Sequence, residues 1–292
     1  MRHLAVLAAL LFAAGCMSRT PPAAEVSIGS SPPPAAMIAS FVPALFAAPR
    51  EVEERAHAAI VVDVGSGEVL FEENAEGLRY PASLTKMMTL YLLFEEIAAG
   101  RMAPDDPLFV TASAVRQPPA KIGLEDGATI RVEDAARAMA VKSANDVAVV
   151  IAENLAGDEA AFAARMTRTA RSLGMADTVF VNASGLPDTG QVTTARDMAI
   201  LARALKVRHP RFAAYFAAKE FRYNGRRFET TNKLLGEVAG VDGIKTGYIR
   251  LSGFNLAASA RRGGRSIIVV VMGGKTGRAR DAEVTRLIDA HL

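Results

Sequence analysis

The chain has 292 residues, half of them apolar, which is enough to bury a large core in one sizeable domain that can have two lobes. Its formal net charge of +3 is small, and its charged residues are scattered without a basic run or interleaved aromatic side chains. This charge pattern argues against nucleic acid as a partner.

The N-terminal segment has the features of an export signal. Arg2 precedes an apolar run over residues 4–14, which is shorter than the roughly 20 residues that span a bilayer. The run ends in Ala-Ala-Gly-Cys16, which resembles a bacterial lipobox, and Cys16 is the only cysteine. We therefore expect a signal peptide over residues 1–15, a lipid on Cys16 that tethers the protein to a membrane, and a periplasmic location. An ordinary secretory signal is the alternative, and a single cysteine permits no internal disulfide under either interpretation.

A tether and then a folded domain are predicted next. Residues 16–50 are rich in proline, alanine and serine and show little helical periodicity, which is typical of a tether. The catalytic domain is expected over residues 51–292. It should begin with a β-hairpin, because an apolar, β-branched run at 58–63 is followed by a glycine-rich turn and a second short strand at 68–71.

A buried helix follows over residues 84–99. Pro81 suits a first helical turn, Gly100 follows the last one, and the helix is apolar on most sides. The later elements are expected to be helices over residues 135–141, 146–155, 159–173 and 194–205, strands over 220–223, 227–230, 254–260 and 266–272, and a helix over 279–290. Strands at both ends around a helical middle indicate an α+β domain whose terminal parts share a sheet.

The sequence Ser83-Leu-Thr-Lys86 places a hydroxyl and an amine on one face of a helix. Because that helix is otherwise apolar, Lys86 should be buried, and desolvation together with a nearby cation such as Lys245 should lower its pKa. A neutral amine can accept the proton of Ser83 and so make the serine a nucleophile. The alternative is a serine at a helix start with a lysine on the surface, and the apolar surroundings argue against it.

Two further motifs add polar groups to the candidate site of Ser83 and Lys86. Ser143-Ala-Asn145 precedes the helix predicted from residue 146, where capping would explain one of the two polar residues but not both. Lys245-Thr246-Gly247 supplies a cationic strand edge, and its glycine would let a substrate backbone approach the strand. The same triplet recurs at residues 275–277, where a connecting loop explains it. Together with the serine–lysine pair, these motifs are typical of serine acyl transfer on a substrate that ends in a carboxylate.

Other chemistries receive little support. The four histidines (His3, His57, His209 and His291) are isolated and no cysteine ligands accompany them, so we expect neither a metal nor a cofactor. No Gly-x-Ser-x-Gly elbow accompanies them, which argues against a Ser-His-Asp triad. Gly274-Lys-Thr276 is similar to the end of a phosphate-binding loop, but Val269 stands where the first glycine of that loop belongs.

Beyond these triplets, the chain resembles the D-alanyl-D-alanine carboxypeptidases, which are low-molecular-mass penicillin-binding proteins of the DD-peptidase/β-lactamase superfamily. The resemblance covers residues 57–291. It is carried by Tyr80–Thr89, Ser143–Asp146, Asn182–Leu186, Thr194–Asp197, Gly243–Tyr248 and Gly253–Leu256. It implies an antiparallel five-stranded sheet flanked by helices, a helical lobe beside the sheet, and a site between them.

The resemblance also implies a reaction. Ser83 would attack the carbonyl between the two terminal D-alanines of a peptidoglycan stem peptide, with Lys86 as the base. The backbone N–H groups of Ser83 and Tyr248 would form the oxyanion hole. Ser143 would relay a proton to the leaving D-alanine, and Asn145 would hold the substrate amide and the lysine. Water would then release the acyl-enzyme, whereas β-lactam antibiotics would act as covalent inhibitors.

Binding of the terminal carboxylate is implied for Lys245 and Thr246, with Gly247 beside them. Arg280 matches an arginine that helps to hold this carboxylate, and a surface arginine at a helix start is the alternative. Tyr248 stands where many members have histidine, which is expected to change the rate or the substrate preference. The sequence does not contain the β-rich domain and anchoring helix of larger members, so we expect the lipid on Cys16 to provide the anchor.

Three alternatives stay open. A class A β-lactamase would carry a Glu-x-x-Leu-Asn loop between Asn145 and Lys245 and an aspartate in place of Ala144, and neither is found. A DD-endopeptidase uses the same machinery, so the sequence barely separates it from a carboxypeptidase. A non-catalytic penicillin sensor would need a membrane span. A wall-binding scaffold would not need a buried Lys86. The sequence favours the carboxypeptidase.

Overall fold

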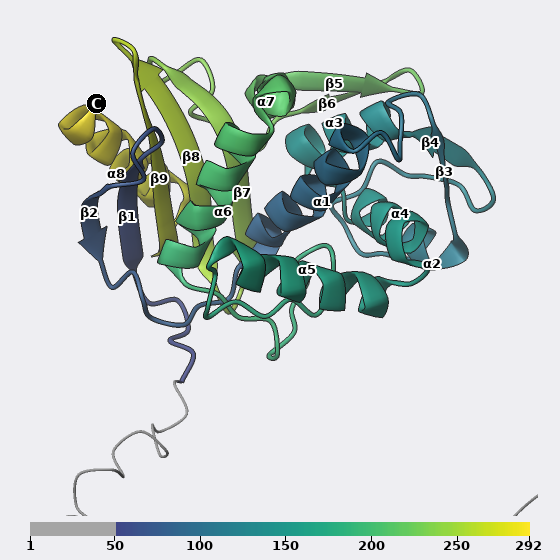
Figure 1. Cartoon of the computed structure of the whole chain (residues 1–292), viewed down its shortest axis with the longest axis horizontal. Helices are drawn as coiled ribbons and strands as arrows, with labels where there is room; N and C mark the ends of the chain where they lie inside the picture. The colour runs from purple at the N-terminus through teal and green to yellow at the C-terminus, as the bar shows by residue number, and fades with distance from the viewer. Residues whose placement is uncertain (1–50) are drawn as a thin grey trace, which may run out of the picture. The chain divides into compact units, whose positions relative to one another are not determined.

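A computed structural model describes residues 51–292 of the chain. The predicted signal peptide, the lipid on Cys16 and the tether fall outside these residues. Within the described range, five strands form one antiparallel sheet in the order β2-β1-β9-β8-β7 (Figure 1). These strands are β1 (Ala58–Asp63), β2 (Val69–Glu73), β7 (Val241–Ile249), β8 (Gly253–Arg262) and β9 (Arg265–Gly274).

The centre of the sheet joins segments from the two ends of the domain. Strand β1 pairs with β9 from Ala58 opposite Met272 to Asp63 opposite Ile267. Both strands are rich in valine and isoleucine and are buried on both faces, which is the environment that favours β-branched side chains. The α+β class and the shared sheet that the sequence predicts are therefore confirmed.

Helices cover both faces of the sheet, and alternate strand residues face opposite sides. On one face, Ala59 and Val61 of β1 belong to the same apolar cluster as Val284, Leu287 and Ile288 of α8 (Gly277–His291). On the other face, the intervening residues of β1 join the main core, which includes α6 (Ala195–Arg208) and α1 (Lys86–Ala98) (Figure 1). Helix α1 thus lies inside the molecule, as its apolar sequence predicts.

A helical lobe lies beside the sheet, next to α1 (Figure 1). Within residues 51–292, no helix combines the length and the apolar character needed to cross a membrane. The remaining elements are two 3-10 turns (Ala82–Thr85 and Pro210–Phe212), helices α2 (Ala112–Val115), α3 (Val132–Lys142), α4 (Asn145–Ala156), α5 (Glu159–Leu173) and α7 (Ala213–Ala217), and the two-stranded sheets β3–β4 (Pro107–Phe109, Thr129–Arg131) and β5–β6 (Glu220–Tyr223, Arg226–Glu229).

Two boundaries near the site differ from the sequence prediction. Helix α1 begins at Lys86 rather than at residue 84, because Ala82 has a φ of +49° and a 3-10 turn precedes the helix. Ser143 was expected at the start of a helix, but it is the residue that ends α3, with φ +61° and ψ +39°. Left-handed backbone at alanine or serine is unfavourable for the isolated residue, so tertiary contacts must impose it at both positions.

Candidate active site

The side chains of Ser83 and Lys86 meet at the junction of the 3-10 turn and α1. Lys86 Nζ lies 3.0 Å from Ser83 Oγ and 2.8 Å from Asn145 Oδ1, and it also contacts the backbone oxygen of Ser184. The last two partners are acceptors only. A neutral amine has two N–H groups for them and one lone pair for the hydroxyl hydrogen of Ser83. The three contacts fit an ammonium that donates to all three oxygens and equally a neutral lysine that accepts from the serine, so burial has to distinguish the two forms.

Burial of Lys86 supports the neutral form. The side chain is fully buried, and desolvation followed by the nearby charge of Lys245 holds the pKa of Lys86 well below its usual value. Asp146 and Glu159 act in the opposite direction, because their carboxylates favour the ammonium. Desolvation is the largest of these effects, so burial favours the neutral amine, which is the form that can accept a proton.

Asn145 connects this pair to the helical lobe. It is the first residue of α4, and its side-chain Nδ2 donates to the backbone oxygen of Pro118 at 3.0 Å. Its backbone N–H donates to Ala120 at 2.7 Å. Ala144 occupies the N-cap position of α4 and no side chain caps this helix, so capping does not explain the motif. Asn145 is fixed from three sides and holds the amine of Lys86.

The adjacent Asp146 secures the loop that holds Asn145. Its carboxylate is fully buried and accepts hydrogen bonds from the backbone N–H groups of Ile122, Gly123 and Val147 at 2.9–3.1 Å. A buried carboxylate is stable only when its oxygens are satisfied in this way. Asp146 thus anchors the loop whose carbonyls accept from the side chain and the backbone N–H of Asn145.

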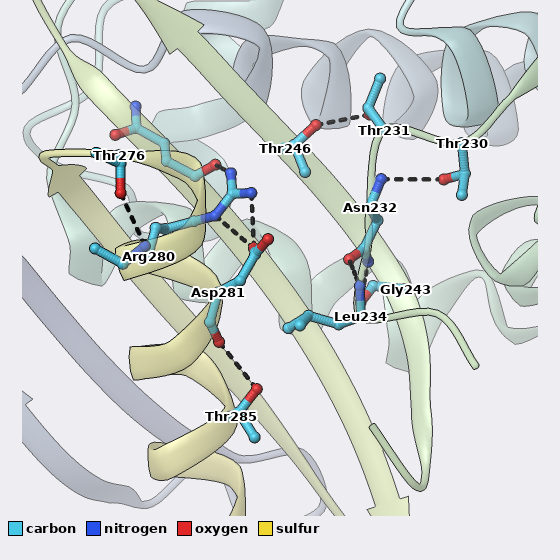
Figure 2. Close-up of polar contacts among 12 residues, drawn as sticks. Thr230, Thr231, Asn232, Leu234, Gly243, Thr246, Thr276, Arg280, Asp281 and Thr285 are labelled. Carbon is cyan, nitrogen blue, oxygen red and sulfur yellow. Dashed lines mark hydrogen bonds and ion pairs between the residues drawn. The ribbon is translucent and has the colours of Figure 1, made fainter. Parts of the chain in front are cut away.

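Strand β7 forms the opposite side of the site and carries the predicted Lys245-Thr246-Gly247. The side chain of Lys245 is buried, and its Nζ donates to the backbone oxygen of Thr246 at 2.9 Å. Desolvation, followed by the charge of Arg280, lowers the pKa of Lys245 to about 7. Thr246 Oγ1 lies 2.7 Å from Thr231 Oγ1 (Figure 2). This strand therefore combines a titratable cation with a fixed pair of hydroxyls.

Two glycines allow other segments to approach the Ser83 turn closely. A Cβ on Gly247 would lie 3.1 Å from the backbone nitrogen of Ser83, and one on Gly185 would lie 1.9 Å from the backbone oxygen of Ala82. Gly185 also has a φ of +82°, which favours glycine. The sequence suggested that Gly247 makes room for a substrate, but the structure gives it a nearer neighbour, the backbone of Ser83.

Tyr248 and Arg280 occupy contrasting environments. The Tyr248 side chain is 55% exposed, and its ring packs on that of Phe254 with centroids 4.3 Å apart. Arg280 lies in the first turn of α8, yet it is buried and donates from Nη1 to the backbone oxygen of Asn255 at 2.7 Å. The alternative that Arg280 is a surface residue is therefore wrong. Its Nε also donates to Asp281 Oδ1 at 2.9 Å (Figure 2).

A single cleft of about 760 Å³ connects these groups, a size typical of ligand sites. The structure brings seven of the predicted residues to its surface, whereas Lys86 and Lys245 are buried. The seven are Ser83, Ser143, Asn145, Thr246, Gly247, Tyr248 and Arg280. The second Lys-Thr-Gly runs from the end of β9 into α8 as a connection. Within residues 51–292, no group of three or more potential ligands could hold a metal ion.

Comparison with known proteins now identifies the fold family. A family model described as D-alanyl-D-alanine carboxypeptidase matches residues 45–276. The chain belongs to this family. D-alanyl-D-alanine carboxypeptidase DacA of Escherichia coli K12 is 37% identical over 236 residues, which cover 78% of this chain and 59% of that protein. DacF of Bacillus subtilis, with the same description, is 33% identical over 263 residues, covering 87% and 67%.

A solved structure of a penicillin-binding protein agrees with this assignment. Penicillin-binding protein D2 of Listeria monocytogenes, in a cefotaxime-bound form, matches with a TM-score of 0.73 and 32% identity, over 82% of this chain and 98% of that chain. The family resemblance and the five-stranded sheet that it implied are thus confirmed. The chain spans about 59–67% of the length of the two curated carboxypeptidases.

The carboxypeptidase family motifs include one residue whose role sequence reasoning missed. Asn255 is buried in β8, and its Nδ2 donates to the backbone oxygens of Tyr80 and Pro81 at 3.1 and 3.3 Å. Its Oδ1 accepts from the N–H of Gly273 at 3.0 Å. Asparagine is rare in strands, so its presence within Gly-Phe-Asn-Leu was a usable signal. Asn255 holds the turn that presents Ser83 against the centre of the sheet.

Proposed function

We propose that the chain is a serine-type D-Ala-D-Ala carboxypeptidase that removes the terminal D-alanine from peptidoglycan stem pentapeptides through an acyl-enzyme on Ser83. The observation that carries this proposal is the contact between Ser83, at the wall of a cleft, and the buried amine of Lys86. The family assignment supplies the substrate class. The cationic groups Lys245 and Arg280 suit a substrate that ends in a carboxylate.

Acylation begins with transfer of the hydroxyl proton of Ser83 to Lys86. The oxygen of Ser83 then bonds to the carbonyl carbon of the penultimate D-alanine, and the carbonyl π electrons move to its oxygen. The N–H groups of Ser83 and Tyr248 stabilise this oxyanion. β7 is an edge strand, so some of its backbone groups are unpaired and can bind the substrate.

Collapse of the tetrahedral intermediate breaks the peptide bond. The proton on Lys86 passes through the Ser143 hydroxyl to the leaving nitrogen, so that D-alanine departs as an amine. Asn145 holds both the lysine and the amide group of the substrate. In the second half-reaction, Lys86 takes a proton from water, the resulting hydroxide attacks the ester, and Ser83 recovers its proton. The peptide then leaves with a new terminal carboxylate.

Substrate and β-lactams share the carboxylate-binding end of the cleft. Thr246 and Arg280 line the cleft there, and Lys245 lies behind them as a buried cation. A β-lactam would acylate Ser83 in the same way, but its leaving amine stays attached to the adduct and hinders water. The cefotaxime-bound Listeria relative supports this part of the proposal.

Export to the periplasm and a lipid on Cys16 complete the proposal. Their support is the apolar N-terminal run and the lipobox-like residues before Cys16. Metabolic labelling of the full chain with a palmitate analogue should mark the wild type, whereas Cys16→Ser should remain unlabelled and lose its association with membranes. Equal labelling of both chains would refute lipidation at this cysteine.

The decisive experiment combines two readouts on the purified protein. Intact-mass spectrometry with benzylpenicillin should show a stable adduct on Ser83, and a pentapeptide ending in D-Ala-D-Ala should release D-alanine. Rapid loss of the adduct with turnover of penicillin would indicate a β-lactamase instead. A stable adduct with cleavage of cross-linked dimers but not of pentapeptide would indicate a DD-endopeptidase. Ser83→Ala is the control for both measurements.

A further inference from the structure

The guanidinium of Arg280 is held by two partners that belong to the protein. Its Nε and Nη2 lie 2.9 and 2.7 Å from the same oxygen, Asp281 Oδ1, and its Nη1 donates to the backbone oxygen of Asn255 at 2.7 Å (Figure 2). An arginine has five N–H groups, so two are left after these three contacts. Because Arg280 lines the cleft, these two are available to a ligand.

The carboxylate of Asp281 has no part in capping its own helix. Thr276 is the N-cap residue of α8, and its Oγ1 accepts from the N–H of Ala279 at 3.0 Å (Figure 2). The contact between Asp281 and Thr285 uses the backbone oxygen of Asp281, not its side chain. Within residues 51–292, the side chain of Asp281 therefore makes contact with Arg280 alone among charged groups.

Asp281 also changes the charge that a ligand meets. A cation in the first turn of a helix is disfavoured by the helix dipole, and the adjacent carboxylate compensates for this. The side chains of Arg280 and Asp281 are 6% and 20% exposed, so solvent screens the pair only weakly. A ligand carboxylate thus meets a nearly neutral pair, and its recognition depends on the direction of the two remaining N–H groups.

We propose that Asp281 is a positioning residue that fixes the orientation of Arg280 for a carboxylate on the substrate. This inference rests on the proposed function. With its orientation fixed, Arg280 recognises the carboxylate through aligned hydrogen bonds. A freely rotating arginine on the surface would not provide this alignment. An arginine that is held before the ligand arrives also loses less conformational freedom on binding.

The test compares ligands that differ in one carboxylate. Second-order acylation rate constants are measured with benzylpenicillin and with its methyl ester, and KM and kcat are measured for D-alanine release. In Asp281→Ala, the ratio of the acid rate to the ester rate should fall by about tenfold, and KM should rise while kcat changes little. Asp281→Asn keeps an acceptor for Arg280 and should restore the ratio to within about threefold of the wild type.

A matched control is available on the same helix. Asp289 pairs with Arg262 at 2.8 Å but does not line the cleft, so Asp289→Ala removes a more exposed Asp–Arg ion pair and should leave the ratio unchanged. If Asp281→Ala does not fold, Asp281→Leu keeps a γ-branched side chain without an acceptor and should give the same tenfold fall.

Three results would overturn the positioning role. The first is an acid-to-ester ratio of acylation rate constants that is unchanged in the folded Asp281 variants. The second is an equal loss of the acylation rate for acid and ester. The third is a fall of this ratio in Asp289→Ala that is as large as the fall in Asp281→Ala. The proposed function fails separately, when the wild type releases no D-alanine. A wild-type protein that benzylpenicillin does not acylate would overturn both ideas.

Discussion

Replacement of Lys86 by methionine tests the central chemical idea. Methionine has a similar length and no branch, so it can fill the same space beside Met87 and Leu90 without adding volume. It cannot accept a proton. Loss of a positioned general base usually costs about 10²–10⁴-fold in rate, or roughly 3–5 kcal/mol in barrier. We expect kcat/KM for D-alanine release to fall by about 10³-fold in Lys86→Met.

The stability of the same variant should change much less. Asn145 Oδ1 and Ser184 O each lose a donor, which costs about 1–3 kcal/mol per buried acceptor. The opposing gain is that an amine no longer has to be desolvated on folding, a cost that the lowered pKa of Lys86 reflects. These effects partly cancel, so we expect the free energy of unfolding to change by less than about 2 kcal/mol and Tm by less than about 8 °C.

The assay measures catalytic activity and folding on the same variant. D-alanine release from diacetyl-L-Lys-D-Ala-D-Ala and acylation by benzylpenicillin are measured beside thermal unfolding, with Ser83→Ala as the inactive reference. A Lys86→Met protein that folds normally but keeps more than about a tenth of wild-type turnover would refute the assignment of Lys86 as the base. A protein that loses both activity and fold would refute the stability estimate.

Three further changes test the surroundings of the site. If the cationic form of Lys245 binds the carboxylate, as we propose, kcat/KM should fall above about pH 7, because the pKa of Lys245 is about 7 and its charge is lost there. Lys245→Arg should flatten this limb of the pH profile, and a fall that persists in the arginine variant would contradict the proposed role. In Gly247→Ala, the added methyl meets the Ser83 backbone, so kcat/KM should drop by about 10–100-fold with Tm nearly unchanged, as steady-state kinetics and calorimetry would show. Asp146→Asn leaves N–H groups of the loop beside Asn145 poorly paired, so urea denaturation should show a loss of about 1–3 kcal/mol, and a variant as stable as the wild type would argue against this anchor.

The sequence was sufficient to predict those features that depend on neighbouring residues and on hydrophobic burial. The apolar sequence around Lys86 was enough to predict its burial, because a lysine on a helix without a polar face has no route to solvent. The hairpin at residues 58–71 was likewise expected from a β-branched apolar run followed by a glycine-rich turn. In each case the deciding interactions lie within a few residues of the motif, or follow from hydrophobic burial alone.

The rest depends on contacts between distant segments. Nothing local predicts the left-handed backbone of Ala82 and Ser143, since neither residue prefers it. The close neighbour of Gly247 is the Ser83 turn, and the partners of Asn255 lie near residues 80 and 273, so these roles exist only once the sheet has formed. The burial of Arg280 against β8 is of the same kind, and a helix-start pattern alone could not reveal it.

The central place of β9 has a consequence for the order of synthesis. The hairpin of β1 and β2 leaves the ribosome early, but its partner β9, which separates β1 from β8, is made only after residues 64–264. Such long-range pairing is slow to form and leaves apolar strand residues uncovered in the meantime. The turn that carries Ser83 also depends on Asn255 and Gly273. A nascent or truncated chain without β9 would therefore have neither a continuous sheet nor a fixed Ser83 turn, and the candidate site can form only after β9 has been made and has paired.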